Sequence, residues 1–128
     1  MGEITSNISW LAVIVGAVVA FLAGWLWYSE RLFGKGWAEG VGVELGAAGD
    51  MPMGAMATQF IGLLLMSWFV GVTAASNLLL TVILGTVAFT VLGMGGAMFR
   101  RQSAYASNVD AGYWILALLI MIIANGIF

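Results

Sequence analysis

MPMGAMATQFIGLLLMSWFVGVTAASNLLLTVILGTVAFTVLGMGGAMF, residues 51 to 99, contains no Asp, Glu, Lys or Arg. A second uncharged run covers residues 4 to 29. A soluble domain of this size needs a polar face, and neither run offers one, so the lipid bilayer is the expected solvent. The charged residues of the chain lie in three places: Glu3, residues 30 to 50, and residues 100 to 110.

The lengths of these uncharged runs predict the number of membrane spans. A bilayer core of about 30 Å needs roughly 20 helical residues. Residues 51 to 99 are too many for one span and match two spans joined by a turn, for which Ala74-Ala75-Ser76-Asn77 supplies suitable residues. We therefore predict an all-α integral membrane protein, a single transmembrane domain over residues 1–128, with four transmembrane helices near residues 8–28, 52–73, 78–99 and 109–128.

The cations predict the orientation. The chain has four, Arg31, Lys35, Arg100 and Arg101, and they lie in two loops that four spans place on the same side of the membrane. By the positive-inside rule that side is cytoplasmic, so both termini and the turn near Ser76 are expected outside. Because no Lys or Arg precedes Arg31, the N-terminus does not resemble a cleaved secretory signal, and we expect a retained first helix.

The loop between the first two spans mixes apolar and charged residues. Three large apolar residues alternate there with three charged ones: Leu32, Phe33 and Trp37 with Arg31, Lys35 and Glu39. This pattern is typical of a short amphipathic helix that lies at the membrane surface. Asp50 and Pro52 follow it and are typical of a helix start, as a cap and an early proline.

Composition excludes several classes of function. Hydrophobic residues make up 62% of the chain and charged residues 8%, and there is no Cys and no His. Thiolate and imidazole chemistry are therefore excluded, together with disulfides and the usual metal and haem ligands. A net charge of -2 with four cations does not suit nucleic acid, which needs a dense basic surface. We expect no catalytic residue, no cofactor and no metal site.

Small and hydroxyl-bearing residues recur at helical spacing within the spans. The first span carries small residues at every fourth position: Ala12, Gly16, Ala20 and Gly24. Such spacing lets two helices approach closely, either between copies of the chain or inside one four-helix unit. Thr86 and Thr90 share a face of the third span. That face is either part of a solute path or a place where hydroxyls bond to their own helix or a neighbour.

Asp110 is the candidate functional residue that stands out most, because it directly precedes the last apolar run. One interpretation is a first-turn carboxylate that joins Ser107 and Asn108 in capping the helix and pairs with a nearby arginine. The other is a carboxylate at the membrane edge that binds a cation or a proton. The candidate polar site at the cytoplasmic edge comprises Glu30, Arg31, Arg100, Arg101, Asp110 and Tyr113.

Two segments resemble a known family. WYSERLFGKGW, residues 27 to 37, and VDAGY, residues 109 to 113, resemble the small bacterial four-helix membrane proteins catalogued as domain of unknown function 1761. The resemblance covers essentially the whole chain, although members often have proline at the position of Glu30. It implies no activity, substrate or cofactor. It places eight residues in recurring motifs: Trp27, Tyr28, Ser29, Phe33, Gly34, Asp110, Gly112 and Tyr113. The Trp-Tyr-Ser triplet also fits an interfacial anchor and helix stop.

Three functional hypotheses follow. The first is a non-enzymatic homo-oligomer in the bacterial cytoplasmic (inner) membrane that binds or passes a small solute or ion. The second is an accessory or packing subunit of a larger membrane complex. The third, least favoured, is a lipid-active enzyme that uses Asp110 or Glu30. The expected partners are the lipid bilayer and either a second copy of the chain or another membrane protein.

Overall fold

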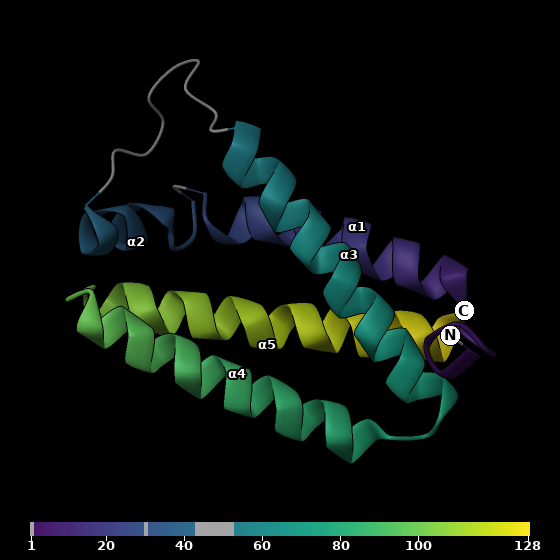
Figure 1. The fold of residues 1–128 in the computed structure, drawn as a ribbon. Coiled ribbons are helices and arrows are strands. Elements are labelled where there is room, and N and C mark those ends of the chain that lie inside the picture. The colour runs from purple at the N-terminus through teal and green to yellow at the C-terminus, as the bar shows by residue number, and fades with distance from the viewer. Residues whose placement is uncertain (1, 30, 43–52) are drawn as a thin grey trace.

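The computed structural model describes residues 2–29, 31–42 and 53–128, and all the regular elements in these ranges are helical (Figure 1). A short 3-10 helix and five α-helices follow one another along the chain: η1 (Gly2–Ile4), α1 (Trp10–Trp27), α2 (Gly34–Val41), α3 (Met53–Ala75), α4 (Leu79–Phe99) and α5 (Ala104–Ile127). Four of them, α1, α3, α4 and α5, are long and apolar enough to cross a membrane. The prediction of an all-α protein with four spans and a short helix between the first two is confirmed. Glu30, Asp50 and Pro52 lie outside the described residues.

The turn between α3 and α4 forms where the sequence predicts it. Asn77 has a positive φ of 56°, and the backbone N–H of Leu78 donates to the carbonyl of Thr73 at 2.8 Å. A left-handed residue followed by this backward bond is the Schellman arrangement that ends a helix, and asparagine tolerates it better than most residues. The uncharged run therefore folds into a helical hairpin.

The start of α5 differs from the prediction. The helix begins at Ala104, and the side chain of Ser103 accepts a hydrogen bond from the backbone N–H of Ala106, as an N-cap residue does. The helix thus extends beyond the predicted span near residues 109–128, and the interpretation of Ser107, Asn108 and Asp110 as its cap is wrong. Asp110 lies in the second turn of α5, where its side chain is free to contact other elements.

The small residues of α1 pack inside the molecule. An added Cβ at Gly16 would lie 2.9 Å from the Ser67 hydroxyl oxygen of α3, and one at Gly24 would lie 2.7 Å from the Tyr113 hydroxyl oxygen of α5. Ala12 and Ala20 are fully buried. The first-span pattern thus brings α1 close to both α3 and α5, as its intramolecular interpretation predicts.

The bundle has two different ends (Figure 1). One end holds α2, the last turn of α4 and the first turn of α5, and we call it the α2 end; the two termini and the α3–α4 turn lie at the other. The cations Arg31, Lys35, Arg100 and Arg101 belong to segments of the α2 end, and all four are exposed. The two cationic segments therefore lie at the same end of the fold, as the prediction of four spans requires.

Candidate functional site

The carboxylate of Asp110 accepts three hydrogen bonds from neutral side chains. Its Oδ1 accepts from the Tyr28 hydroxyl at 2.5 Å and from the Trp37 indole N–H at 2.9 Å, and its Oδ2 accepts from the Gln102 amide at 3.0 Å. The bond from Tyr28 is the shortest of the three. We call Asp110, Tyr28, Trp37 and Gln102 the Asp110 centre.

Three separate segments bring these donors to Asp110. Tyr28 is the C-cap residue of α1, Trp37 lies on α2, and Gln102 lies in the short connection between α4 and α5. The centre therefore joins the ends of the elements that meet at the α2 end. It can form only when α1, α2 and α5 are packed together.

Gly34 permits the chain to turn from α1 into α2. A Cβ at this position would overlap the backbone carbonyl of Tyr28, so the close approach requires glycine. The backbone N–H of Gly34 donates to the carbonyl of Ser29 at 2.9 Å, and Gly34 itself is buried. This tight turn directs α2 toward α5 and brings Trp37 to Asp110.

Aromatic rings surround the centre. The ring of Tyr28 makes edge contacts with Trp37 at 5.1 Å and with Tyr113 at 5.5 Å between centroids. Trp27 packs against Phe33 at 4.6 Å, and its indole N–H donates to the carbonyl of Val109 at 3.0 Å. These rings exclude water from one side of the carboxylate, which strengthens its hydrogen bonds.

Burial raises the pKa of the Tyr28 hydroxyl, and its hydrogen bond to Asp110 raises that pKa further. Both effects disfavour a phenolate, since burial penalises charge and the neighbouring carboxylate repels it. Tyr28 lies just after the span Trp10–Trp27. Because its pKa is raised, its hydroxyl stays protonated at neutral pH and can donate to Asp110.

The structure brings together only some of the predicted site residues. Tyr113 contacts Tyr28, but its own hydroxyl donates to the carbonyl of Ala20 at 2.7 Å. Arg31, Arg100 and Arg101 are exposed, and within the described part of the chain none forms an ion pair with Asp110. Neutral donors thus occupy the positions that the sequence interpretation gave to arginine. Glu30 lies outside the described residues.

The two segments of the family resemblance meet in space. Trp27 bonds to Val109 and Tyr28 to Asp110, and a Cβ at Gly112 would lie 3.0 Å from the Trp27 ring. Ser29 is an exception, because its hydroxyl donates to the carbonyl of Leu26 near the end of α1. The two segments therefore pack against each other in one region of the fold.

Two residues of the Asp110 centre, Trp37 and Gln102, are not among the site residues predicted from the sequence. Trp37 lies within the first resembling segment, which was the available signal for it, but it was assigned to a surface helix. Gln102 follows two arginines in a polar connection, and nothing in its local sequence indicates that it donates a hydrogen bond to Asp110. Both donate to Asp110 because α2 packs on α5 and because the α4–α5 connection lies beside this carboxylate.

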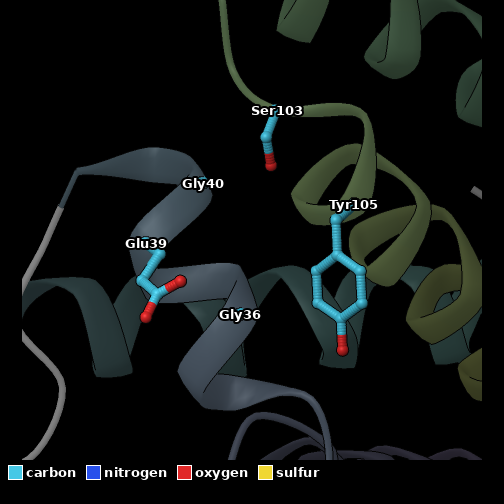
Figure 2. Close-up of a pocket in the computed structure, with 5 residues that line it drawn as sticks. All are labelled: Gly36, Glu39, Gly40, Ser103 and Tyr105. Atoms are coloured by element: carbon cyan, nitrogen blue, oxygen red, sulfur yellow. The ribbon is translucent and has the colours of Figure 1, made fainter.

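An open cavity of about 390 Å³ lies at the surface where α2 meets the start of α5 (Figure 2). It is lined by Gly36, Glu39, Gly40, Ser103 and Tyr105. A smaller cavity of about 220 Å³ lies at the opposite end of the bundle, between α3, α4 and the end of α5. In the ranges that the structure describes, no three His, Cys, Asp or Glu side chains gather in a way that could hold a metal ion.

Of the comparisons with known proteins, only the comparison with protein families finds a match. The model of the family described as "Protein of unknown function (DUF1761)" matches residues 11–126. No curated protein and no solved structure matches the chain. Because the match covers nearly the whole sequence, the chain belongs to the DUF1761 family of proteins of unknown function.

Proposed function

We propose that the chain is a non-enzymatic membrane protein that binds a small monovalent cation at Asp110 and works as a homo-oligomer. The observation that carries the proposal is a half-buried carboxylate held by three neutral donors, with no cationic partner among the described residues. Ionisable groups at membrane depth are costly and commonly serve ion or proton binding.

The three hydrogen bonds leave part of the acceptor capacity of the Asp110 carboxylate unoccupied. A carboxylate offers about four acceptor positions, and protein donors occupy three of them. The three donors are neutral, so they bring no positive charge to the carboxylate, and a bound cation would supply it. A single carboxylate suits a monovalent ion better than a divalent one, which prefers several oxygen ligands of its own.

A catalytic role for Asp110 fits this geometry poorly. A general acid or base must reach a proton of the substrate at about 2.6–3.2 Å. Tyr28 and Trp37 instead occupy Oδ1, and the surrounding rings cover that oxygen. Binding without chemistry therefore agrees better with the arrangement.

Self-association is supported by small residues on the outer face of α3. Gly54, Thr58 and Gly62 follow one another at every fourth position and are all exposed. A Cβ added at Gly54 or Gly62 would meet no other atom within 4 Å. Because the small residues of α1 are used inside the molecule, α3 offers the surface on which a second helix could approach closely.

The alternative function is an accessory subunit of a larger membrane complex, and α4 favours it. Leu80, Leu92 and Phe99 are 80%, 77% and 92% exposed, so a wide apolar face of this helix has no partner in the monomer. Sizing in a mild detergent separates the two functions. A closed homo-oligomer supports the first, and a monomer that copurifies with another membrane protein supports the second.

The membrane and orientation are part of the same proposal. Motif resemblance to small bacterial proteins supports the bacterial inner membrane. The exposed cations at the α2 end support a cytoplasmic position for that end, with both termini outside.

Cation binding is tested by thermal unfolding of the purified protein in detergent. Sodium chloride, potassium chloride and choline chloride are compared at equal ionic strength and at one fixed pH. We expect an alkali cation to raise the unfolding temperature of the wild type, and Asp110→Asn to abolish that dependence. Glu3→Gln, an exposed acid at the opposite end, is the matched control. An unchanged dependence in Asp110→Asn would refute cation binding at this centre.

A further inference from the structure

We infer that the cavity between α2 and the start of α5 is a second binding site, selective for a primary ammonium group. That group is supplied either by the ethanolamine head of a membrane lipid or by a soluble amine. The inference uses residues outside the Asp110 centre and does not depend on cation binding there. It starts from the cavity of about 390 Å³ and from the acid on its wall.

Glu39 supplies the charge. It lies on α2, its side chain is exposed, and the described residues give it no hydrogen bond or ion pair. Figure 2 shows Glu39 and Tyr105 on the two sides of the α2 segment that carries Gly36 and Gly40. Both groups line the same cavity, where the unpaired carboxylate attracts a cation by its charge and the ring attracts one by its negative face. An anionic ligand would be repelled.

The remaining wall supplies hydrogen-bond acceptors. Ser103 caps α5 through one lone pair of its hydroxyl oxygen, which receives the N–H of Ala106 at 3.0 Å. A second lone pair stays available, and the half-exposed Tyr105 hydroxyl provides another acceptor. A primary ammonium has three N–H donors, which these oxygens and the Glu39 carboxylate can receive. A quaternary ammonium has none and could use only the charge and the ring.

Two glycines hold the walls in place. A Cβ at Gly36 would lie 2.5 Å from the Tyr105 ring, and one at Gly40 would overlap the Ser103 hydroxyl and lie 2.7 Å from the Ala106 side chain. The backbone N–H of Ser103 donates to the carbonyl of Gly40 at 3.1 Å. The α2 backbone therefore lies directly against α5, and the cavity is formed before any ligand arrives.

The position of the cavity agrees with a ligand at the membrane surface. It lies at the α2 end, where α5 begins and α4 ends, so lipid head groups can reach it (Figure 1). A volume of about 390 Å³ accommodates an ammonium group on a short chain. Lys35, one turn before Glu39 on α2, is the nearest competitor in sequence, and it makes no ion pair with Glu39 in the described structure.

The test measures which lipid the purified protein retains. The full chain in detergent is mixed with phosphatidylethanolamine, phosphatidylcholine or phosphatidylglycerol, and bound lipid is counted by native mass spectrometry. We expect preferential retention of phosphatidylethanolamine, reduced about two- to five-fold by Glu39→Gln, the size expected for one partly exposed ion pair. Lys35→Gln keeps or strengthens retention, and Glu3→Gln leaves it unchanged.

A second arm identifies the source of the ammonium. If soluble ethanolamine raises the unfolding temperature in a Glu39-dependent way and the lipids are retained equally, the ligand is a soluble amine. Equal lipid retention with no effect of ethanolamine overturns the inference, as does preference for phosphatidylglycerol or full retention by Glu39→Gln.

Two more variants separate this site from its surroundings. Tyr105→Phe keeps the ring and is expected to retain most of the preference, whereas Tyr105→Leu removes the ring and weakens it. Asp110→Asn should leave lipid retention unchanged, and Glu39→Gln should leave the alkali-cation response unchanged. The failure of either proposal is thus distinguishable from the failure of the other.

Discussion

The hydroxyl of Tyr28, which caps the end of α1, donates a 2.5 Å hydrogen bond to the carboxylate of Asp110, 82 residues later on α5. Trp37 of α2 donates to the same oxygen. One carboxylate therefore joins the first span, the short helix and the last span at a single point. Because these segments are distant in sequence, both hydrogen bonds form only when the helices are packed together. Their loss should therefore be measurable as a lower stability of the bundle.

Tyr28→Phe should lower the free energy of unfolding in detergent by about 1.5–3 kcal/mol, the range for a hydrogen bond to a charged group. The ring stays and only the hydroxyl is lost, so packing against Trp37 and Tyr113 is kept. Tyr105→Phe, which changes a half-exposed ring away from Asp110, is the control and should have little effect. Equal losses in the two variants would argue against an ionised acceptor at Asp110.

Trp37→Phe should also destabilise the bundle, by about 1–3 kcal/mol, because Asp110 loses an N–H donor while an aromatic ring remains. Proteolysis is the second readout: with this bond gone, α2 should be cleaved faster by a protease added to the detergent-solubilised protein. Trp25→Phe alters an exposed residue of α1 and should change neither quantity. Unchanged cleavage in Trp37→Phe would show that Asp110 does not hold α2 in place.

The number of candidate spans and the common end of the two cationic segments were predictable from charge and length, because a bilayer tolerates so few charges. The turn at Ser76 and Asn77 was also predictable, since asparagine tolerates the left-handed backbone conformation that Asn77 adopts. The start of α5 was not, because the length of a helix need not equal that of its membrane span. Its first two turns, from Ala104 to Asp110, pack on α2 and therefore do not need an apolar sequence.

The hydrogen-bond partners of Asp110 could not be predicted from the sequence for a related reason. Opposite charge in a nearby loop made Arg100 and Arg101 the obvious candidates, yet both are exposed at the edge of the bundle. Exposed ion pairs contribute little, whereas neutral donors on packed segments reach the carboxylate without a desolvated cation. Which donors arrive depends on the turn at Gly34 and on the short α4–α5 connection, and neither is encoded by local charge.

Gly24→Ala should destabilise the protein by about 1–3 kcal/mol, as overpacking of a close contact does. The new methyl would lie 2.7 Å from the Tyr113 hydroxyl, and that ring is 1% exposed and bonded to Ala20, so it cannot move aside freely. Gly95→Ala is the matched control: Gly95 is helical and has no neighbouring atom within 4 Å of an added Cβ, so the change should be neutral or stabilising by up to about 1 kcal/mol. Thermal unfolding of both variants in one detergent gives the comparison, and similar behaviour of the two would contradict the close approach of α1 and α5.

Single cysteines can establish the orientation, because the natural chain contains none. Ser76→Cys lies in the exposed α3–α4 turn, and Glu39→Cys lies on the exposed side of α2. We expect a membrane-impermeant maleimide to label Ser76→Cys in intact cells and to label Glu39→Cys only after the membrane is opened, because the cations gather at the α2 end. The reverse pattern would place the α2 end outside and contradict the positive-inside interpretation. Labelling of both cysteines from the same side would contradict the four-span arrangement itself, since the turn and α2 lie at opposite ends of the bundle (Figure 1).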